Sequence, residues 1–387
     1  MIQNSPSRLH NSADTLAGLD TPCLIIDEQK MDANITRLRT RLDAAGVGFS
    51  PHLKTAKSMA IAKRLLTTVH DPAAVSTLRE AEFFADQGLT KLTYAVGITP
   101  HKLSRVQALR SRGLDLTIIL DSVEQAQAVA ACSSIDNPIP VLIELDCDGH
   151  RSGVRPDNAE LLLAIAQTLK PTALLRGVLT HAGESYAAKN TDQLVAAAEN
   201  ERLSSLKSAD ILRSKGYTCP VISVGSTPTA HFAPSYEGIT EVRAGVFVFF
   251  DLVQTGLGVC NMEDIALSVL ATVIGHQHDK GWTIIDAGWT ALSGDRGTAR
   301  QATDYGYGAV CDLSGRILPG LTVVEVNQEH GIVGLGQNFQ GIDPKLPIGT
   351  RLRILPNHAC ATAEQHDRYH VLANEKIIAH WPRFRGW

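Results

Sequence analysis

Residues 114–145, LDLTIILDSVEQAQAVAACSSIDNPIPVLIEL, contain two apolar strand-like runs, Leu114–Leu120 and Pro140–Leu145, on either side of a helix-like stretch, Glu124–Ala131. A helix between two short apolar runs is typical of a parallel strand pair, because parallel neighbours need a crossover connection. The same alternation continues on both sides of this stretch, so the number of repeats decides the fold.

Six further strand candidates extend the pattern between residues 47 and 250, and most are separated by helix-like segments: Val47–Ser50, Ala74–Thr77, Lys91–Val96, Leu175–Thr180, Val221–Val224 and Val242–Phe250. Eight short apolar strands that alternate with helices favour a TIM-like (β/α)8 barrel over an open sheet.

From about Asn261 the helical periods give way to β-rich segments, which predict a C-terminal all-β domain: Leu267–Ile274, Trp282–Asp286, Leu321–Val326, Gly331–Leu335, Arg351–Leu355 and Arg368–Leu372. We therefore expect three parts. Residues 1–28 form an N-terminal segment whose strand, Thr21–Asp27, joins the β domain; residues 29–258 form the barrel, which opens with a helix over Glu28–Ala45; and residues 259–387 form the β domain.

The composition is that of an ordinary enzyme, with 44% hydrophobic and 20% charged residues among 387 and a net charge of -4. No block of like charges points to nucleic acid or an anionic membrane surface, so small-molecule partners are expected. Seven cysteines without CxxC spacing, a start without an apolar leader and no apolar run of about 20 residues favour a cytoplasmic protein outside the membrane.

Polar residues gather where the predicted strands end, which is where barrels of this type build their sites. Lys54, in SPHLKTAK, follows the first barrel strand, and a lysine there either reaches solvent or is held for chemistry. Gly225, Ser226 and Thr227 follow the seventh strand; such a turn is common, but at this place in a barrel it favours a phosphate cradle. With Arg151 of HRSG, a Schiff-base lysine and a phosphate cradle indicate pyridoxal phosphate.

His358 and Cys360 lie two residues apart in LPNHACA, at the end of a predicted strand. If the backbone there is extended, both side chains project to one side and can share a metal ion. The alternative is a buried histidine beside an unreactive cysteine. Two protein ligands would leave open positions on a divalent ion such as Mg, Mn or Zn, which suits a catalytic site.

Several longer segments resemble the D-threonine aldolase and D-serine dehydratase family of pyridoxal phosphate enzymes, whose barrel is similar to that of alanine racemase (fold type III). The likeness runs from about Thr21 to the C-terminus and is carried by PHLKTAKS, VSTLREAE, DGHRSGV, THAGESY, ISVGSTPT, TEVRAGVFVFFD, DAGW, NQEHG and LPNHACAT.

The resemblance implies a role for each candidate residue. It selects Lys54 over Lys57 as the Schiff-base lysine and His358 with Cys360 as the metal pair, with the cysteine similar to the dehydratase branch. It leaves Phe247 and Phe249 where a phosphate-binding tyrosine is expected. The remaining cofactor contacts that it implies are Thr77, Gly225, Ser226, Thr227 and Gly245 near the phosphate, and Arg151, His181 and Tyr186 near the pyridine ring.

The resemblance also implies a lyase that acts on a D-3-hydroxy amino acid, first of all D-threo-3-hydroxyaspartate, which would yield oxaloacetate and ammonia. Arg296 and Arg300 are candidate partners for the second carboxylate of that substrate. The alternatives are D-serine dehydration, retro-aldol cleavage of the D-threonine aldolase type, racemisation, and a non-catalytic pyridoxal phosphate carrier. A monomer or a homodimer is expected.

Overall fold

The computed structural model describes residues 15–149, 151–336 and 346–387, so the first 14 residues of the expected N-terminal segment lie outside the described part. The chain forms two compact units. The barrel unit comprises Asp32–Asp264 and Arg383–Trp387, and the β unit comprises Ile265–Pro382 with the described part of Met1–Met31. The last five residues thus belong with the barrel, far from it in sequence.

The barrel unit contains eight parallel strands, which confirms the predicted (β/α)8 architecture. A parallel bridge between His52 and Ala74 joins the two ends of the strand order and closes the ring. In spatial order the strands are β2 (Gly48–Phe49), β9 (Glu241–Val242), β8 (Val221–Val224), β7 (Leu174–Thr180), β6 (Pro140–Leu145), β5 (Asp115–Leu120), β4 (Lys91–Gly97) and β3 (Ala73–Val75).

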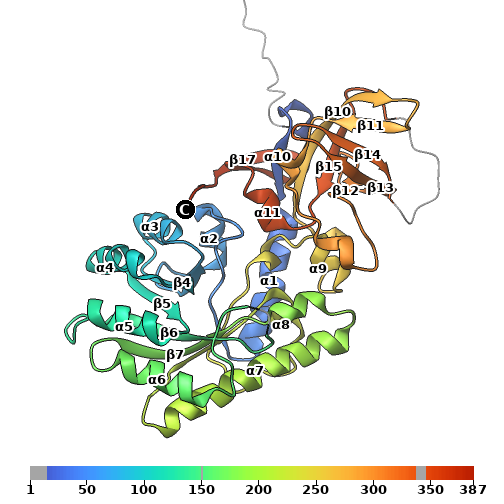
Figure 1. The fold of residues 1–387 in the computed structure, drawn as a ribbon. Helices are drawn as coiled ribbons and strands as arrows, with labels where there is room; N and C mark the ends of the chain where they lie inside the picture. Colours follow the sequence, from blue (N-terminus) through green and yellow to red (C-terminus); the bar gives the residue numbers. More distant parts are fainter. Residues whose placement is uncertain (1–14, 150, 337–345) are drawn as a thin grey trace, which may run out of the picture. The chain divides into compact units, whose positions relative to one another are not determined.

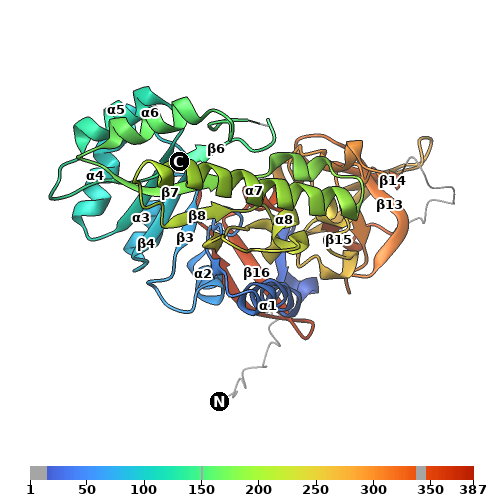
Figure 2. The ribbon, with the colours of Figure 1, turned by 90° about the horizontal axis from the view of Figure 1, so that it is seen from below.

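Helices α3 to α7 lie on the outer side of these strands (Figure 1). The longest, α7, runs alongside β7 and β8 (Figure 2). Ile119, Leu142 and Leu179, from three neighbouring strands, pack together in a buried cluster. The helices from α1 to α9 are α1 (Glu28–Ala44), α2 (Met59–Leu65), α3 (Leu78–Asp86), α4 (Leu103–Ser111), α5 (Val123–Cys132), α6 (Ala159–Leu169), α7 (Thr191–Ser214), α8 (Thr227–Phe232) and α9 (Leu252–Gly256), with short 3₁₀ turns η2 (Leu16–Gly18), η3 (Pro100–Lys102), η4 (Gly183–Ala187), η5 (Val246–Val248) and η6 (Met262–Asp264).

The eighth strand was predicted too long. Only Glu241–Val242 is a strand, and the rest of Val242–Phe250 contains the 3₁₀ turn η5 and a residue, Phe250, with φ of 50°. The sequence misled because its apolar residues are all buried, and an unbroken apolar run does not distinguish a strand from a buried turn.

The β unit is built on one nine-stranded sheet. Its strands in spatial order are β11 (Trp282–Ile285), β14 (Gly331–Leu335), β13 (Ile317–Val326), β12 (Ala309–Cys311), β15 (Arg351–Leu355), β10 (Leu267–Gln277), β1 (Cys23–Asp27), β16 (Arg368–Ala373) and β17 (Lys376–Pro382). Two short helices, α10 (Trp289–Leu292) and α11 (Ala359–Ala363), and a 3₁₀ turn, η7 (Gly297–Arg300), complete the unit. Strands β12 and β17 are absent from the prediction made from the sequence.

Strand β1 lies inside this sheet, antiparallel to β10 and parallel to β16. Its Ile25 is fully buried and packs in a cluster with Leu270 and Leu372. A strand that comes before the barrel therefore forms part of the core of the unit that follows it. Within the described residues, no helix combines the length and apolar character needed to cross a membrane.

Candidate active site and metal centre

Lys54 sits in a helical turn directly after the bridge that closes the barrel. The turn is held by the Lys57 N–H, which donates to the Leu53 carbonyl over 2.8 Å. Lys54 itself is exposed, whereas Lys57 is buried with its Nζ 3.8 Å from Glu80 Oε1. The second oxygen of Glu80 accepts from the Ser76 N–H at 2.8 Å. Of the two lysines, Lys57 thus has a structural ion pair and Lys54 is available for chemistry.

His52 and His181 are both affected by the positive charges of Lys54 and Arg151. The Lys54 N–H lies 3.5 Å from His52 Nδ1, and His181 Nδ1 lies 2.8 Å from the Gly225 carbonyl oxygen. Burial, followed by the charges of Arg151 and Lys54, lowers the pKa of His181 to about 3. Burial and the charge of Lys54 also hold the pKa of His52 well below its usual value. Because a carbonyl only accepts, neutral His181 carries its proton on Nδ1 and presents Nε2 as an acceptor.

The turn after β8 is tightly constrained. Gly225 has φ of 145°, and a Cβ there would lie 1.9 Å from the Arg243 carbonyl oxygen, so only glycine fits. Its N–H donates to Glu201 Oε1, and the Ser226 N–H donates to Thr229 Oγ1 in a capping box. Among the described residues, nothing accepts from the Thr227 N–H. This donor is available to an anion.

The other predicted cofactor contacts lie in the same unit. Thr77 caps α3 by accepting from the Glu80 N–H at 3.0 Å. At Gly245 an added Cβ would lie 3.0 Å from Thr55 Oγ1 and 3.1 Å from the His52 carbonyl oxygen, which leaves no room for a side chain beside the Lys54 turn. The Tyr186 ring is centred 6.3 Å from that of His181. Their assignment to pyridoxal phosphate stays a prediction.

Two buried charged residues that the sequence analysis missed support these loops. Glu201, from α7, is 2% exposed, and its Oε1 accepts from the N–H groups of both Ala182 and Gly225, at 3.0 and 2.8 Å. Burial raises the pKa of Glu201 and outweighs the hydrogen bonds that lower it. Arg243 donates to the Ser223 hydroxyl and the Thr180 carbonyl. Glu201 lies in none of the quoted motifs, and Arg243 lies within TEVRAGVFVFFD, where the resemblance assigned it no role.

The His358–Cys360 pair lies at the start of α11, in the β unit. His358 has extended angles, with φ of -132° and ψ of 109°, but Cys360 is already within the helix. The condition of extended backbone therefore holds at His358 but not at Cys360, because the alanine-rich segment Ala359–Ala363 forms a helical turn. Both remain close in sequence on one helix start, and imidazole with thiolate is a donor set that suits a divalent ion.

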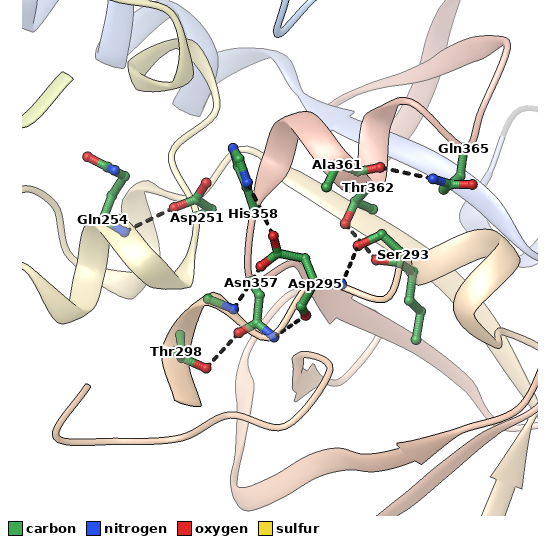
Figure 3. Close-up of polar contacts among 12 residues, drawn as sticks. Asp251, Gln254, Ser293, Asp295, Thr298, Asn357, His358, Ala361, Thr362 and Gln365 are labelled. Carbon is green, nitrogen blue, oxygen red and sulfur yellow. Dashed lines mark hydrogen bonds and ion pairs between the residues drawn. The ribbon is translucent and has the colours of Figure 1, made fainter. Parts of the chain in front are cut away.

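The carboxyl group of Asp295 faces His358 in Figure 3, with Oδ2 3.5 Å from His358 Nδ1. The hydrogen bond from His358 lowers the pKa of Asp295. Within the described residues, no group of three or more His, Cys, Asp or Glu side chains could hold a metal ion. Arg296 pairs with Asp304 over 2.7 Å, and Arg300 is exposed.

Each of the two units matches the model of a known protein family. The family model for the alanine racemase N-terminal domain matches residues 26–253, and that for the putative serine dehydratase domain matches residues 266–372. The chain belongs to the D-threonine aldolase and D-serine dehydratase family, with an alanine racemase-type barrel. It is thus a lyase-family enzyme, and members of this family depend on pyridoxal phosphate.

Within this family, the chain is 52% identical to the D-threo-3-hydroxyaspartate dehydratase of Delftia sp. (strain HT23), over 97% of this chain and 100% of that protein. It is 28% identical to the D-serine dehydratase of Dictyostelium discoideum, over 96% and 98%. A solved structure of the first enzyme, a cysteine-to-alanine mutant in the metal-free form, matches with a TM-score of 0.92 and 52% identity over 97% of this chain and 100% of that one.

Proposed function

We propose that this member of the family is a pyridoxal phosphate- and divalent metal-dependent dehydratase that converts D-threo-3-hydroxyaspartate to oxaloacetate and ammonia. The observation that carries the proposal is the 52% identity over the full length of an enzyme with that activity. The reaction balances: elimination removes the Cα proton and the β-hydroxyl as water, and hydrolysis of the enamine returns one water and releases ammonia.

The barrel unit fits the cofactor. Gly225 and Gly245 allow the backbone to pass close to its neighbours at the two turns, the Thr227 N–H supplies a donor for phosphate, and Lys54 supplies an exposed amine. Bound pyridoxal phosphate would supply an electron sink for the charge that develops at Cα. In our proposal Lys54 would hold the cofactor and move the Cα proton, and Arg151 would be the partner of the ring nitrogen.

His358 and Cys360 would hold the metal in the β unit. When bound, the ion would supply Lewis acidity to the β-hydroxyl. The metal-free form of the related mutant enzyme supports a metal at a cysteine-containing site. Whether Mg, Mn or Zn is native stays open to assay, as does the choice between monomer and homodimer. A cytoplasmic location also stays a prediction.

The test is product analysis on the purified holoenzyme. With D-threo-3-hydroxyaspartate we expect equal amounts of oxaloacetate and ammonia; glycine with glyoxylate would instead identify retro-aldol cleavage and overturn the proposal. No turnover of any D-3-hydroxy amino acid would favour a carrier. A panel with D-serine and D-threonine ranks the substrates.

Replacing the proposed cofactor lysine gives the second test. Lys54→Ala should lose the absorbance band of lysine-bound cofactor and at least about 10³-fold in kcat, since it removes both the attachment point and the base. Lys57→Met is the matched lysine control and should keep the band. Retention of the band in Lys54→Ala would refute this role of Lys54.

Metal removal gives the third test. Treatment with a chelator should abolish dehydration, because the leaving hydroxyl loses its Lewis acid, while the cofactor absorbance is unchanged. Addition of Mg²⁺, Mn²⁺ or Zn²⁺, each assayed separately, should restore the dehydration activity. Full activity in the metal-stripped enzyme would exclude a catalytic ion.

A further inference from the structure

Asp295 directs its carboxylate at the imidazole of His358. The Oδ2 to Nδ1 distance is 3.5 Å, and the two side chains are 30% and 45% exposed. Figure 3 shows the carboxyl group of Asp295 turned toward the His358 ring. The two residues come from different segments, since Asp295 follows α10 and His358 begins α11. The contact therefore depends on how the β unit folds.

Asp295 is itself fixed by its other polar atoms. Its Oδ1 accepts from the Gly297 N–H at 2.7 Å, and its N–H donates to Ser293 Oγ at 3.3 Å. One carboxylate oxygen thus shapes the local turn while the other faces His358. The local turn uses only Oδ1, so it does not account for the contact between Oδ2 and the imidazole of a distant segment.

A buried amide ties the two segments together. Asn357, 2% exposed and adjacent to His358, donates from Nδ2 to the carbonyl oxygens of Asp295 and Gly306, at 3.0 and 2.6 Å. Its Oδ1 accepts from the Thr298 hydroxyl at 2.8 Å. Because every polar atom of this amide is engaged, the backbone of Asp295 is anchored to the residue that precedes His358 (Figure 3).

We propose that Asp295 is a positioning residue that holds His358 for metal binding. A carboxylate that accepts from Nδ1–H keeps the imidazole in the tautomer whose Nε2 is the ligand, and fixes the plane of the ring. This inference rests on the proposed metal-dependent function, in which His358 and Cys360 hold the ion. Asp295 is not a third ligand in this scheme, consistent with the absence of any three-residue ligand group among the described residues.

The test measures Mn²⁺ affinity of metal-stripped holoenzyme by the loss of the free Mn²⁺ paramagnetic resonance signal. Asp295→Ala should weaken binding by about 10- to 100-fold, the usual effect of removing an outer partner of a metal-binding histidine. Asp295→Asn keeps an oxygen that accepts from Nδ1–H and should recover most of that loss. The cofactor absorbance and the unfolding temperature should stay those of the wild type in Asp295→Asn.

Asp304→Ala is the matched control, because Asp304 Oδ1 accepts from the Gly306 N–H at 2.9 Å as Asp295 Oδ1 does from Gly297, but its Oδ2 pairs with Arg296. This variant should leave Mn²⁺ affinity unchanged. Wild-type Mn²⁺ affinity in Asp295→Ala would overturn the inference. Mn²⁺ binding in Asp295→Asn that is as weak as in His358→Ala would also overturn it, because Asp295 would then be a ligand. Failure of the wild type to bind Mn²⁺, Mg²⁺ or Zn²⁺ would instead refute the metal-dependent function.

Discussion

One oxygen of Glu201 accepts hydrogen bonds from two strand-end loops, at Ala182 after β7 and at Gly225 after β8. The same loops carry His181 and the Gly225–Thr227 turn. A single carboxylate, buried in the barrel unit, therefore sets the spacing between a candidate ring contact and the candidate phosphate cradle.

Glu201→Ala should destabilise the protein by about 2–6 kcal/mol, since it leaves two buried N–H groups without acceptors at about 1–3 kcal/mol each. It should also weaken pyridoxal phosphate binding, because the Gly225 turn is no longer held. Urea unfolding and cofactor titration measure the two effects.

Glu201→Gln retains an acceptor oxygen and should lose much less stability. Glu199→Ala, two residues away on the same helix, removes only a surface pair with Arg202 and should cost less than about 1 kcal/mol. If Glu201→Ala were as stable as Glu199→Ala, the bridging role would be wrong.

The residues that sequence reasoning found and missed differ in a physical way. Lys54 and the Gly225–Thr227 turn follow apolar runs, so their position at strand ends was readable from the sequence. Glu201 lies within a 24-residue helix, where a single glutamate is indistinguishable from a solvent-facing one. Asp295 contacts His358 only in the folded protein, so the spacing of residues within a short motif could not predict this pair.

Among the elements, the segment Arg383–Trp387 makes an unexpected contribution to the barrel unit. The Phe384 ring stacks on Phe83, with centroids 4.3 Å apart and planes at 25°, and its N–H donates to the Lys57 carbonyl at 3.1 Å. Lys57 Nζ lies 5.7 Å from the Phe384 ring centroid. The segment thus contacts Lys57, the last residue of the turn that carries Lys54.

Phe384→Ala should lower the free energy of unfolding by about 1–3 kcal/mol, from lost apolar burial and aromatic stacking. Trp387→Ala, at a side chain that is 83% exposed, should change it by less than about 1 kcal/mol. Chemical denaturation of both variants decides the point; equal stability of the two would show that the stacking contributes nothing measurable.

Several strands were predicted with their observed bounds from sequence, whereas the eighth barrel strand was predicted too long and β12 and β17 were not predicted. Strands β6, β8 and β14 have the predicted bounds, Pro140–Leu145, Val221–Val224 and Gly331–Leu335. Strand β12, of three residues, is too short to show a period, and its neighbours β13 and β15 define it by pairing. The helical conformation at Cys360 belongs to α11, a helix of only five residues, which is likewise too short to show a period.

At the scale of the whole molecule, buried histidines link stability to pH. Burial lowers the pKa of His231 to about 4, from an unfolded value of 6.5. A lowered folded-state pKa means that the unfolded chain binds more protons at mildly acid pH, so stability is present above pH 6.5 and is lost as pH falls toward 4. His52 and His181 act in the same direction.

We expect the free energy of unfolding of the holoenzyme to fall between pH 7.5 and pH 5, and His231→Gln to reduce that slope. His101→Gln, at an exposed site, is the control and should leave the slope unchanged. Denaturation curves at four or five pH values test this. A slope in His231→Gln equal to that of the wild type would contradict the assignment.

Strand β1 imposes an order of assembly during synthesis. It leaves the ribosome before the barrel does, yet both of its partners, β10 and β16, lie beyond the entire barrel sequence. Most of the barrel segment, Asp32–Asp264, is available to fold while β1 still waits with its backbone donors and acceptors unpaired. The nascent chain therefore carries an apolar strand, CLIID, through most of translation, and a ribosome-stalled chain ending before β10 should engage holdase chaperones through that strand.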